Sequence, residues 1–461
     1  MLDKNNYKKY IQLLSSYFKA IDKKPKAMVV TYGCQQNTSD SEIIKGMLEE
    51  IGYEFCQTYE QADLVVFNTC AVREHAELKV YGNIGSLKPV KKKKPDLKIA
   101  VCGCMMQQES VQKEIKKSYR YVDIVFGPSL ICNFPQMLYN CVCNGDKTFD
   151  RDEITDIVEN MPVKREQNNK AWVTVMYGCN NFCTYCIVPY LRGRERSRKM
   201  QDIVAEVKSL VKSGYKDITL LGQNVNSYGK DLNLGYDFSD LLTELNKIDG
   251  AFWIRFMTSH PKDCTTKLLD TMANCDKVCK QLHLPFQAGN DRVLKEMNRR
   301  YTSEQYKKLI SYAREKMPDI TLTSDVIVGF PGETFDEFMD TVKLVEEIEF
   351  DNLYTFIYSR RSGTPAAIME NQVDKEEKSR RFDILLKVLH PISKKKNDLL
   401  YKKVVRVFVE GLSKTDSTVL SGKTEGGKTV DFVGDENLIG SFVCVEIIEC
   451  KTWSLVGKIV E

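Results

Sequence analysis

Three cysteines near the middle of the chain have the spacing of ligands for an iron–sulfur cluster. Cys179, Cys183 and Cys186 follow a short apolar run in the pattern Cys-x3-Cys-x2-Cys. A [4Fe–4S] cluster is usually held by four thiolates, and this loop supplies three, which leaves one iron open to a small molecule. Zinc and scattered buried thiols are the alternatives, but zinc sites usually have paired Cys-x2-Cys units and four closed ligands. The spacing therefore favours an open iron–sulfur site.

A second set of three cysteines follows three predicted strands near the amino terminus. Cys34, Cys70 and Cys104 each come directly after a short apolar run. Loops that follow successive parallel strands converge on one edge of a sheet, so we expect these thiols to meet. The glycines before Cys34 and Cys104 favour close backbone approach over plain packing. Cys102 competes with Cys104 for the third place, because strand alternation predicts that both side chains point to the same face.

The other cysteines are interpreted as structural, because thiols are commonly buried as small hydrophobic groups. The pair Cys275-x3-Cys279 has ligand-like spacing but no third partner in sequence. The structural set is Cys56, Cys132, Cys141, Cys143, Cys264, Cys275, Cys279, Cys444 and Cys450.

Length and composition describe a globular protein of several domains. A chain of 461 residues is too long for one hydrophobic core and suggests two to four domains. We find neither an apolar stretch long enough to span a membrane nor the pattern of a signal peptide, so we expect a cytoplasmic protein. Thiols stay reduced there, so the 16 cysteines are predicted to be ligands and core residues rather than disulfides. The net charge of +4 does not by itself indicate a nucleic-acid binder.

The elements that must position the cysteines fall into three α/β and β regions. Residues 1–25 are predicted to be a helical extension. In residues 26–145, strand candidates at 27–31, 63–67 and 97–101 alternate with helices, which predicts βαβ units and a doubly wound parallel sheet.

Residues 165–395 show a second alternation, which predicts a partial, open (β/α)6 barrel of the TIM type. Such barrels place their chemistry at the carboxyl ends of the strands, and Cys179 follows the first of them. Residues 374–403 are predicted to be a basic helix with a kink at Pro391. Residues 398–461 have short strands and glycine-rich turns, which predict a small β-barrel. The barrel strand candidates are 172–177, 217–221, 253–258, 281–285, 323–328 and 353–358.

These residues resemble the methylthiotransferases of the radical S-adenosylmethionine (SAM) superfamily over about residues 27–461. That family joins an amino-terminal domain with an auxiliary cluster, a radical SAM core and a carboxyl-terminal TRAM domain. Three positions depart from its usual pattern: Gln36 replaces Met, Tyr177 replaces Gln, and Gly426–Gly427 stand where Asn is frequent. The resemblance is carried by residues 31–37, 68–74, 178–190, 258–261, 283–289, 328–333 and 420–424.

Within this family the chain is most similar to enzymes that act on N6-dimethylallyladenosine in tRNA. The resemblance implies two [4Fe–4S] clusters and SAM, and it favours Cys104 over Cys102. One cluster would donate an electron to SAM and generate a 5′-deoxyadenosyl radical. The other would hold the sulfur that is inserted, with a methyl group, at C2 of the nucleoside next to the anticodon. The implied ligands are the amino-terminal trio (Cys34, Cys70, Cys104) and the central trio (Cys179, Cys183, Cys186).

That reaction needs a cofactor, because adenine C2–H is an unactivated position that no side-chain base can attack. The protein must place a flipped-out base between radical and sulfur and exclude water. Ser324 has the alternative of capping a turn, and His283 that of a hydrogen-bonded core residue. The expected SAM contacts are Tyr185, Gly222, Gln223, Asn224, Ser324, Asp325, Val326 and Gly329, and the expected substrate contacts are Arg192, Arg194, His260, His283 and Gln287.

Positive charge gathers at 91–94, in a predicted loop, at 192–199 and in the helix 374–403. The arginines after Cys186 are placed to hold RNA phosphates or the SAM carboxylate. In residues 402–461 acidic side chains slightly outnumber basic ones, so shape and a local face must carry RNA binding there. The expected partners are a tRNA anticodon stem-loop and an external electron donor, and we expect a monomer.

Two other functions fit parts of the pattern. The first is the same methylthiolation on threonylcarbamoyl adenosine in tRNA or on an aspartate of a ribosomal protein. Arg73-Glu74 and the turn at 421–424 favour the dimethylallyl substrate. The second is an RNA-binding module whose clusters are structural or redox-sensing. Two sets of three ligands argue against it, because structural metal sites are normally closed.

Overall fold

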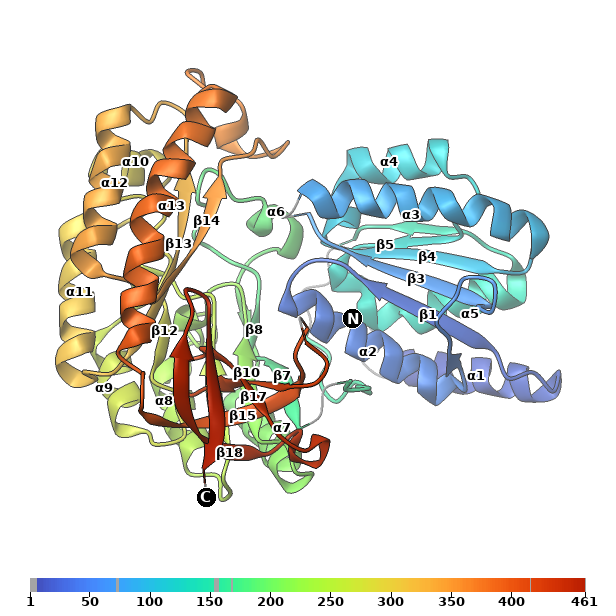
Figure 1. Ribbon diagram of the computed structural model, residues 1–461. Helices are drawn as coiled ribbons and strands as arrows, with labels where there is room; N and C mark the ends of the chain where they lie inside the picture. Colours follow the sequence, from blue (N-terminus) through green and yellow to red (C-terminus); the bar gives the residue numbers. More distant parts are fainter. Residues whose placement is uncertain (1–5, 72–73, 153–156, 167–168, 415, 461) are drawn as a thin grey trace. The chain divides into compact units, whose positions relative to one another are not determined.

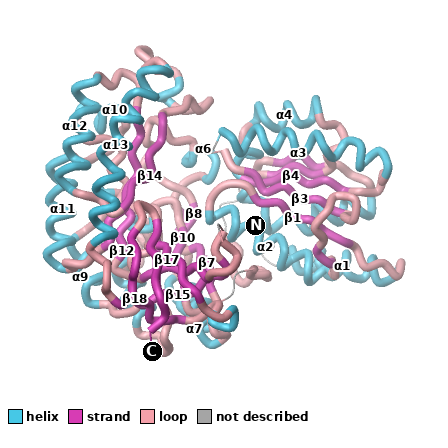
Figure 2. Tube along the Cα trace, viewed as in Figure 1, coloured by secondary structure: helices cyan, strands magenta, loops and turns pink. Residues whose placement is uncertain are grey.

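The computed structural model describes residues 6–71, 74–152, 157–166, 169–414 and 416–460, and the side chains of residues 74–76 are left aside. The chain divides into two compact units. The first contains residues 1–166 and 187–196, and the second contains residues 167–186 and 197–461. Figures 1 and 2 show the helices and strands of both units. Val72 and Arg73 of the motif at 68–74 lie outside the described residues.

The first unit is built on a six-stranded parallel sheet with the order β2-β1-β3-β4-β5-β6. Three of these strands fall where the sequence predicts them, and the other three are short strands at the sheet margins. The central strands β3 and β4 are buried, as the unbroken apolar runs require for a sheet covered on both faces. The bounds are β1 Lys26–Thr31, β2 Glu54–Phe55, β3 Leu64–Thr69, β4 Lys98–Gly103, β5 Ile124–Phe126 and β6 Thr148–Asp150.

Helices cover both faces of this sheet, which confirms the doubly wound α/β fold. One face packs on α1, α2 and α5, and the other packs on α3 and α4 (Figure 1). The five-residue α6 adds to the second face through Ile187 and Leu191. The bounds are α1 Asn6–Ala20, α2 Gln35–Ile51, α3 Glu74–Lys93, α4 Glu109–Ser118, α5 Phe134–Tyr139 and α6 Val188–Arg192.

The amino-terminal helix α1 is part of the core of the first unit. Tyr7, Ile11, Leu14 and Phe18 lie at helical spacing and are buried against α2 and α5. The Tyr7 hydroxyl also donates a hydrogen bond of 3.1 Å to the Asn160 carbonyl. The extension is therefore a covering helix of the sheet, not an appendage.

The lysine run at 91–93 ends α3, where the sequence analysis placed a loop, so that prediction was wrong. The helix continues past Pro89, and the lysines occupy its last turn. Lys91 Nζ lies 3.0 Å from Asp123 Oδ2. Cations at a helix carboxyl terminus oppose its partial negative charge, which stabilises this extension of the helix.

The second unit contains six parallel barrel strands in two hydrogen-bonded sheets, β11-β10-β7 and β12-β13-β14. They correspond to the six predicted strands, with β10 at its predicted bounds and the ends of the others shifted by at most three residues. A short pair, β8 Met176–Tyr177 and β9 Arg196–Ser197, lies beside them. The bounds are β7 Lys170–Thr174, β10 Asp217–Leu221, β11 Trp253–Phe256, β12 Gln281–His283, β13 Thr321–Val328 and β14 Asn352–Ile357.

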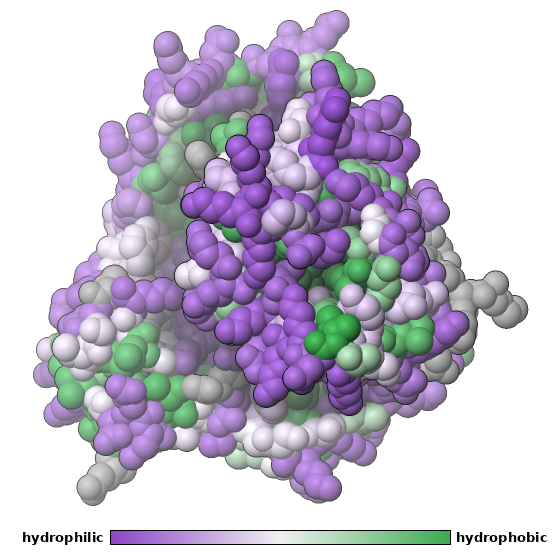
Figure 3. All heavy atoms as spheres, turned by 90° about the vertical axis from the view of Figure 1, so that its right-hand side faces the viewer, coloured by the Kyte–Doolittle hydropathy of each residue, from purple (hydrophilic) through white to green (hydrophobic). Residues whose placement is uncertain are grey.

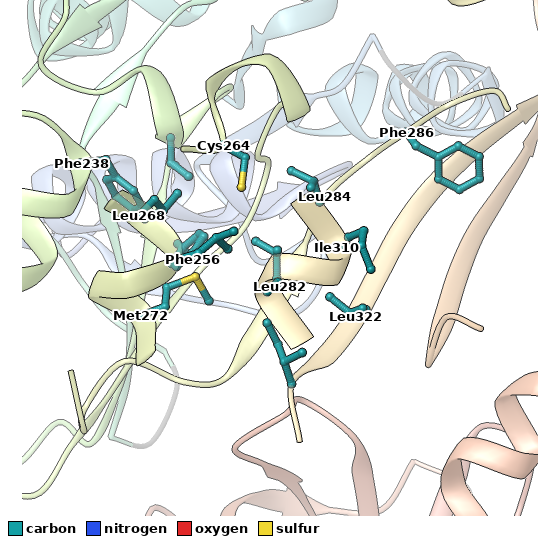
Figure 4. Close-up of a cluster of buried hydrophobic side chains, with 14 of the residues drawn as sticks. Phe238, Phe256, Cys264, Leu268, Met272, Leu282, Leu284, Phe286, Ile310 and Leu322 are labelled. Carbon is teal, nitrogen blue, oxygen red and sulfur yellow. The ribbon is translucent and has the colours of Figure 1, made fainter. Parts of the chain in front are cut away.

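One hydrophobic core joins these strands to their helices. Figure 4 shows part of it, where Cys264 lies among side chains such as Leu268 and Leu284. Helix α13 runs through Pro391 and contributes Leu385 and Leu389 to the same core. The bounds are α7 Met200–Lys212, α8 Phe238–Asn246, α9 Thr266–Asn274, α10 Asp291–Glu296, α11 Ser303–Lys316, α12 Phe335–Ile348 and α13 Lys375–Asp398.

The carboxyl-terminal strands form a closed barrel in the order β15-β16-β17-β19-β18. Arg255 ties it to the barrel strands, because its guanidinium donates to Asp217 Oδ2 at 2.9 Å and to the Thr424 carbonyl at 2.9 Å. A Cβ at Gly426 would lie 2.1 Å from Thr321 Oγ1, so this close approach explains a glycine in the turn. The bounds are β15 Val404–Leu412, β16 Leu420–Thr424, β17 Thr429–Val433, β18 Phe442–Cys450 and β19 Ser454–Val460.

Among the described residues, the helices are too short or too polar to cross a membrane. On the face that Figure 3 shows, hydrophilic side chains predominate and hydrophobic ones form small groups.

Candidate functional site

The structure brings the loops of the amino-terminal trio to one edge of the first sheet. Cys34 caps the start of α2 after β1, Cys70 follows β3, and Cys104 begins a 3-10 turn after β4. The strands β1, β3 and β4 are direct neighbours and run parallel, so the three residues share the carboxyl edge. The described cysteines form no disulfide.

Two glycines permit the close approach of these loops. Gly33 has φ +108°, and a Cβ there would lie 2.3 Å from Cys70 Cβ and 2.7 Å from its Sγ. Gly103 has φ +95°, and a Cβ there would lie 2.4 Å from the Thr69 carbonyl oxygen. Both positions therefore require a residue without a side chain, which holds the Cys34, Cys70 and Cys104 loops together.

The side chain of Asn37 fastens the same three loops. Its Nδ2 donates to the carbonyls of Tyr32 at 2.8 Å and Thr69 at 2.9 Å. Its Oδ1 lies 3.9 Å from the Sγ atoms of both Cys34 and Cys104. Asn37 is fully buried, so this amide is a fixed part of the site.

Arg192 reaches the trio from α6, which packs against the turn that carries Cys104. Its Nε donates to Cys104 Sγ at 3.1 Å, and its Nη2 donates to Asn37 Oδ1 at 2.9 Å and Asp40 Oδ2 at 2.8 Å. The residue is 8% exposed. The expectation that Arg192 holds RNA phosphate or SAM carboxylate is therefore wrong, because its guanidinium is buried and engaged.

The other candidate arginines divide by burial. Arg198 is buried, and its Nη1 donates to the Thr174 carbonyl at 2.7 Å and to Glu206 at 2.8 Å. Arg194 is exposed and stays a candidate for phosphate contact.

Cys102 and Cys104 lie on opposite faces of the sheet, contrary to the expectation that they share one. Cys102 packs with the core that α1 and α2 cover, and Cys104 packs with the core under α3 and α4. The positive φ of Gly103 interrupts the strand between them, so alternation does not continue to Cys104. Burial raises the pKa of the Cys104 thiol to about 11, and the neighbouring Arg192 opposes that rise.

The chemistry of the side chains at the amino-terminal edge fits an iron–sulfur cluster. Among the described residues, no three Cys, His, Asp or Glu side chains stand close enough to share one metal ion. Three thiols, loops that glycines allow to approach closely, and a guanidinium at one sulfur fit the donor set that an anionic cluster needs.

The central trio lies in a loop that neighbouring backbone and side chains hold in place. Gly178 has φ +77°, and its amide donates to Gln223 Oε1 at 2.5 Å. Asn298 Nδ2 donates to the carbonyls of Asn181 at 3.2 Å and Phe182 at 2.9 Å. The loop after the first barrel strand is therefore fixed at its start and in its middle.

A buried arginine also lies beside this trio. Arg299 is 6% exposed, and its Nη1 lies 3.6 Å from Cys183 Sγ. Within the described part of the chain, no carboxylate lies at ion-pair distance from Arg299. Its Nη2 donates to the Pro285 carbonyl, and its permanent positive charge suits an anionic group bound at the cysteines. The central trio thus also fits a cluster.

Two aromatic rings and a histidine surround Arg299. Tyr185 is half-buried against the core, and burial raises its pKa well above the usual value. Tyr301 accepts from Arg299 Nε at 3.1 Å and stacks edge-on with His260, with ring centroids 5.8 Å apart. Burial and then Arg299 lower the pKa of His260 to about 2, so the ring is neutral.

The predicted SAM contacts on the second barrel strand have mixed outcomes in the structure. Gln223 contacts the cysteine loop as described above. Asn224 is buried, its Nδ2 donates to Asp263 Oδ2 at 2.7 Å, and its Oδ1 has no hydrogen-bond partner. A Cβ at Gly222 would lie 2.6 Å from Met176 Cγ. Asn224 Oδ1 is thus a buried acceptor without a hydrogen-bond partner, as is Asn226 Oδ1 in the same segment.

On the fifth barrel strand, the structure excludes Ser324 as a ribose contact. Ser324 is fully buried, its Oγ donates to the Leu284 carbonyl at 2.8 Å, and it accepts from the Phe286 amide at 2.9 Å. The Val326 side chain likewise packs in the core, so only its backbone remains for adenine. Asp325 points to the opposite face and is partly exposed.

On the face of β13 and β14 to which Asp325 points, polar and aromatic side chains lie together. Tyr354 pairs with Asp325 in register, and its ring lies edge-on to His283 at 5.6 Å. His283 Nδ1 is 3.0 Å from Thr323 Oγ1, and its Nε2 is 3.5 Å from Asp325 Oδ1. Phe356 lies two residues further along the same face and is 49% exposed. This face is the part of the strands that is open to a flat ligand.

Gln287 contributes mainly through its backbone. It has φ +70°, forms a bridge with Val326 and is buried. Its amide donates to the Asp325 carbonyl at 2.9 Å, so it positions the strand that carries Asp325.

Sequence reasoning missed Asn298, Arg299, Tyr301, Tyr354 and Phe356. The first three follow α10, far in sequence from the cysteines of either trio. The two aromatic residues read as ordinary strand residues. Only the exposure of Tyr354 and Phe356 on one strand face distinguishes them, and the sequence does not show exposure.

Three family descriptions match separate parts of the chain. Residues 26–127 match "Uncharacterized protein family UPF0004", residues 173–345 match "Radical SAM superfamily", and residues 402–460 match "TRAM domain". These matches fall on the sheet of the amino-terminal trio, the barrel strands of the central trio and the closed barrel.

Similar curated proteins match along nearly the whole length. A protein of Alkaliphilus oremlandii is 54% identical over 440 residues, which is 95% of this chain and 93% of the relative. One of Acetivibrio thermocellus is 56% identical over 93% of this chain and 90% of the relative. Both are named tRNA-2-methylthio-N(6)-dimethylallyladenosine synthase.

A solved structure confirms the fold. The radical SAM methyltransferase TsrM from Kitasatospora setae, with cobalamin and a [4Fe–4S] cluster bound, matches with a TM-score of 0.55 at 14% identity, over 75% of this chain and 77% of that one. The two curated relatives match at higher identity, and over more of the chain, than this solved structure does. The chain therefore belongs to the tRNA-2-methylthio-N6-dimethylallyladenosine synthase family of radical SAM methylthiotransferases.

Proposed function

We propose that this chain inserts sulfur and a methyl group at C2 of N6-dimethylallyladenosine next to the anticodon of tRNA. The family implies SAM and a [4Fe–4S] cluster as cofactors and tRNA as substrate. The observation that carries the proposal is the second trio, because Cys34, Cys70 and Cys104 share one sheet edge in addition to the central trio.

Both trios have assigned roles in the proposal. The central trio would hold a cluster that supplies the electron for SAM cleavage, and the amino-terminal trio would hold a cluster that carries the sulfur to be inserted. Gln223 and Asn298 fix the loop of the central trio, and Arg299 balances its charge. Asn37 fastens the loops of the amino-terminal trio.

The substrate pocket is assigned to the open face of β13 and β14. Tyr354 and Phe356 offer aromatic surface on which a flipped-out base stacks. Asp325 and His283 offer hydrogen-bond groups beside that surface. Because Tyr354 is 45% and Phe356 49% exposed, both rings are accessible to such a base.

The proposal also includes the region of tRNA that is bound, the electron donor, the compartment and the oligomeric state. We assign recognition to the anticodon stem-loop, with Arg194 and the exposed lysines of α13 near its phosphates. The reaction needs an external electron donor, takes place in the cytoplasm and is carried out by a monomer.

Iron counting tests the proposal. After anaerobic reconstitution, we expect about eight irons per chain in the wild type and about four in Cys34→Ala, since two four-iron cubes become one. Cys34→Ala should still release 5′-deoxyadenosine from SAM but form no methylthio product. The control is Cys56→Ala, a half-buried cysteine outside both trios, which should behave as wild type.

The nature of the substrate is tested in cells. Nucleoside mass spectrometry of tRNA from a deletion strain should show loss of the methylthio group on dimethylallyl adenosine alone. Loss on threonylcarbamoyl adenosine, or on a ribosomal-protein aspartate, would transfer the proposal to those substrates. An iron count of four in the wild type, with no release of 5′-deoxyadenosine, would reject the enzyme altogether.

A further inference from the structure

Arg192 is the one charged side chain that donates directly to a thiol of the amino-terminal trio among the hydrogen bonds described above. Its guanidinium forms a fork, with Nε on Cys104 Sγ at 3.1 Å and Nη2 on Asp40 Oδ2 at 2.8 Å. The same Nη2 donates to Asn37 Oδ1 at 2.9 Å. The arginine thus joins a candidate ligand, the amide that fastens the loops, and a carboxylate.

The position of Arg192 is fixed by the fold. Ile187 and Leu191 pack in the same core as Cys104, so the short helix α6 cannot turn without disturbing that core. Gly193, with φ +73°, ends the helix immediately after the arginine. Asp40 is held in turn, because Gln36 Nε2 donates to its Oδ1 at 3.1 Å. Arg192 is therefore preorganised at the cysteine and needs no rearrangement to meet a cluster.

The surrounding protein helps to set the reduction potential of an iron–sulfur cluster. Net charge and hydrogen bonds to the sulfurs are two of the controlling factors. A guanidinium keeps its charge under all ordinary conditions, and its N–H groups are oriented by the plane of the fork. A donor fixed at a ligand sulfur favours the more negative, reduced state of the cluster. Asp40 acts in the opposite direction, because its carboxylate offsets the guanidinium charge.

We propose that Arg192 is a positioning residue that raises the reduction potential of the cluster at Cys34, Cys70 and Cys104, and that Asp40 moderates this effect. The inference rests on the proposed function, since it needs a cluster at that trio. It assigns to this arginine a role in setting the ease of one-electron reduction at the sulfur-carrying site, rather than a role in binding RNA.

The test isolates one cluster. In a parent chain with Cys179→Ala, Cys183→Ala and Cys186→Ala, reconstitution should leave only the amino-terminal cluster. Its midpoint potential is then measured by titration with dithionite, followed by electron paramagnetic resonance. Arg192→Gln removes the charge and the Nε donor, so the midpoint should move to a more negative value. Asp40→Asn removes the opposing charge, so the midpoint should move to a more positive value.

A matched control separates this effect from loss of a buried ion pair. Arg255 is also buried and lies 2.9 Å from a carboxylate, that of Asp217, but it belongs to the second unit. Arg255→Gln should lower the melting temperature and leave the midpoint of the amino-terminal cluster unchanged. A structural role for Arg192 alone would not produce shifts of opposite sign in Arg192→Gln and Asp40→Asn.

The outcomes separate the two proposals. If the parent chain binds no iron, the proposed function fails with this inference. If the parent binds about four irons and both variants keep its midpoint, only the role of Arg192 is overturned. If Arg192→Gln loses its iron, Asp40→Asn decides, and a midpoint that does not become more positive overturns the role. Loss of iron from both variants also overturns it, because the two residues would then serve assembly alone.

Discussion

Replacing Gly33 with alanine tests how closely the loops of the amino-terminal trio approach. The added Cβ would stand 2.3 Å from Cys70 Cβ and 2.7 Å from Cys70 Sγ. Such distances force the backbone or the cysteine to move, and overpacking of this kind typically costs about 1–3 kcal/mol. The φ of +108° adds a strain of about 1–3 kcal/mol for a residue with a side chain. We expect a total of about 2–6 kcal/mol and a displaced Cys70.

The chain offers a matched control in Gly52, at the end of α2. Gly52 has φ +107°, almost the same as Gly33, but a Cβ there meets nothing within 4 Å. Gly52→Ala therefore carries the backbone strain alone, about 1–3 kcal/mol. The difference between the two variants isolates the contact with Cys70.

Two measurements check this prediction. Hydrogen exchange of the β1 and β3 amides reports the local opening free energy, which should fall further in Gly33→Ala than in Gly52→Ala. Iron per chain after anaerobic reconstitution should fall from about eight to about four in Gly33→Ala only. Equal iron content and equal exchange in both variants would refute the close approach of the Cys34 and Cys70 loops.

Three further predictions concern stability and the central loop. Leu14→Ala should lower the free energy of unfolding in urea by about 2–5 kcal/mol, because Leu14 is fully buried. Leu13→Ala is the control and should lower it little, because Leu13 is 38% exposed. Equal losses of stability in the two variants would contradict a core role for α1. Burial raises the pKa of Glu333 from 4.5 to about 7, so the folded state holds an extra proton between these values and stability should fall by about 3 kcal/mol as pH rises through that window. In thermal melts across pH 4 to 8, Glu333→Gln should lack this loss of stability with rising pH. A pH dependence equal to that of the wild type would contradict the raised pKa of Glu333. Asn298→Gly tolerates the positive φ but loses both hydrogen bonds to the cysteine loop. Chelators should therefore remove iron from this variant faster than from the wild type. An equal rate of iron loss would show that the loop is held without these two hydrogen bonds.

Most of the fold was predictable because it follows from local patterns. Apolar runs of five or six residues separated by helices determine a parallel sheet, and the strands 217–221 and 281–283 begin where the sequence placed them. The place of the amino-terminal trio was predictable for the same reason, since strand order decides which loops meet. The expectation about Lys91–Lys93 was wrong because α3 continues past Pro89 to Lys93. The expectation about Cys102 was wrong because the positive φ of Gly103 interrupts the strand alternation before Cys104.

The engagement of single side chains was not predictable. Arg192 follows Cys186 in sequence, and nothing in that spacing shows that it turns to Cys104. Ser324 is followed by Asp325, and only the register of β13 decides which of them is buried. Such details depend on tertiary contacts between segments that lie 40 to 155 residues apart, as the bonds of Ser324 to Leu284 and of Arg192 to Asn37 do. Sequence periodicity carries no information on those contacts.

The membership of residues 187–196 in the first unit has a consequence for synthesis on the ribosome. The backbone leaves that unit after Glu166 and returns to it at Ile187 before departing again after Arg196. A nascent chain that has emerged only as far as residue 166 therefore lacks α6 and the guanidinium beside Cys104. Its sheet can assemble early, but the sheet edge that carries Cys34, Cys70 and Cys104 is completed only once residues 187–196 have been translated. A fragment expressed from residues 1–166 would for the same reason be an imperfect replica of this unit.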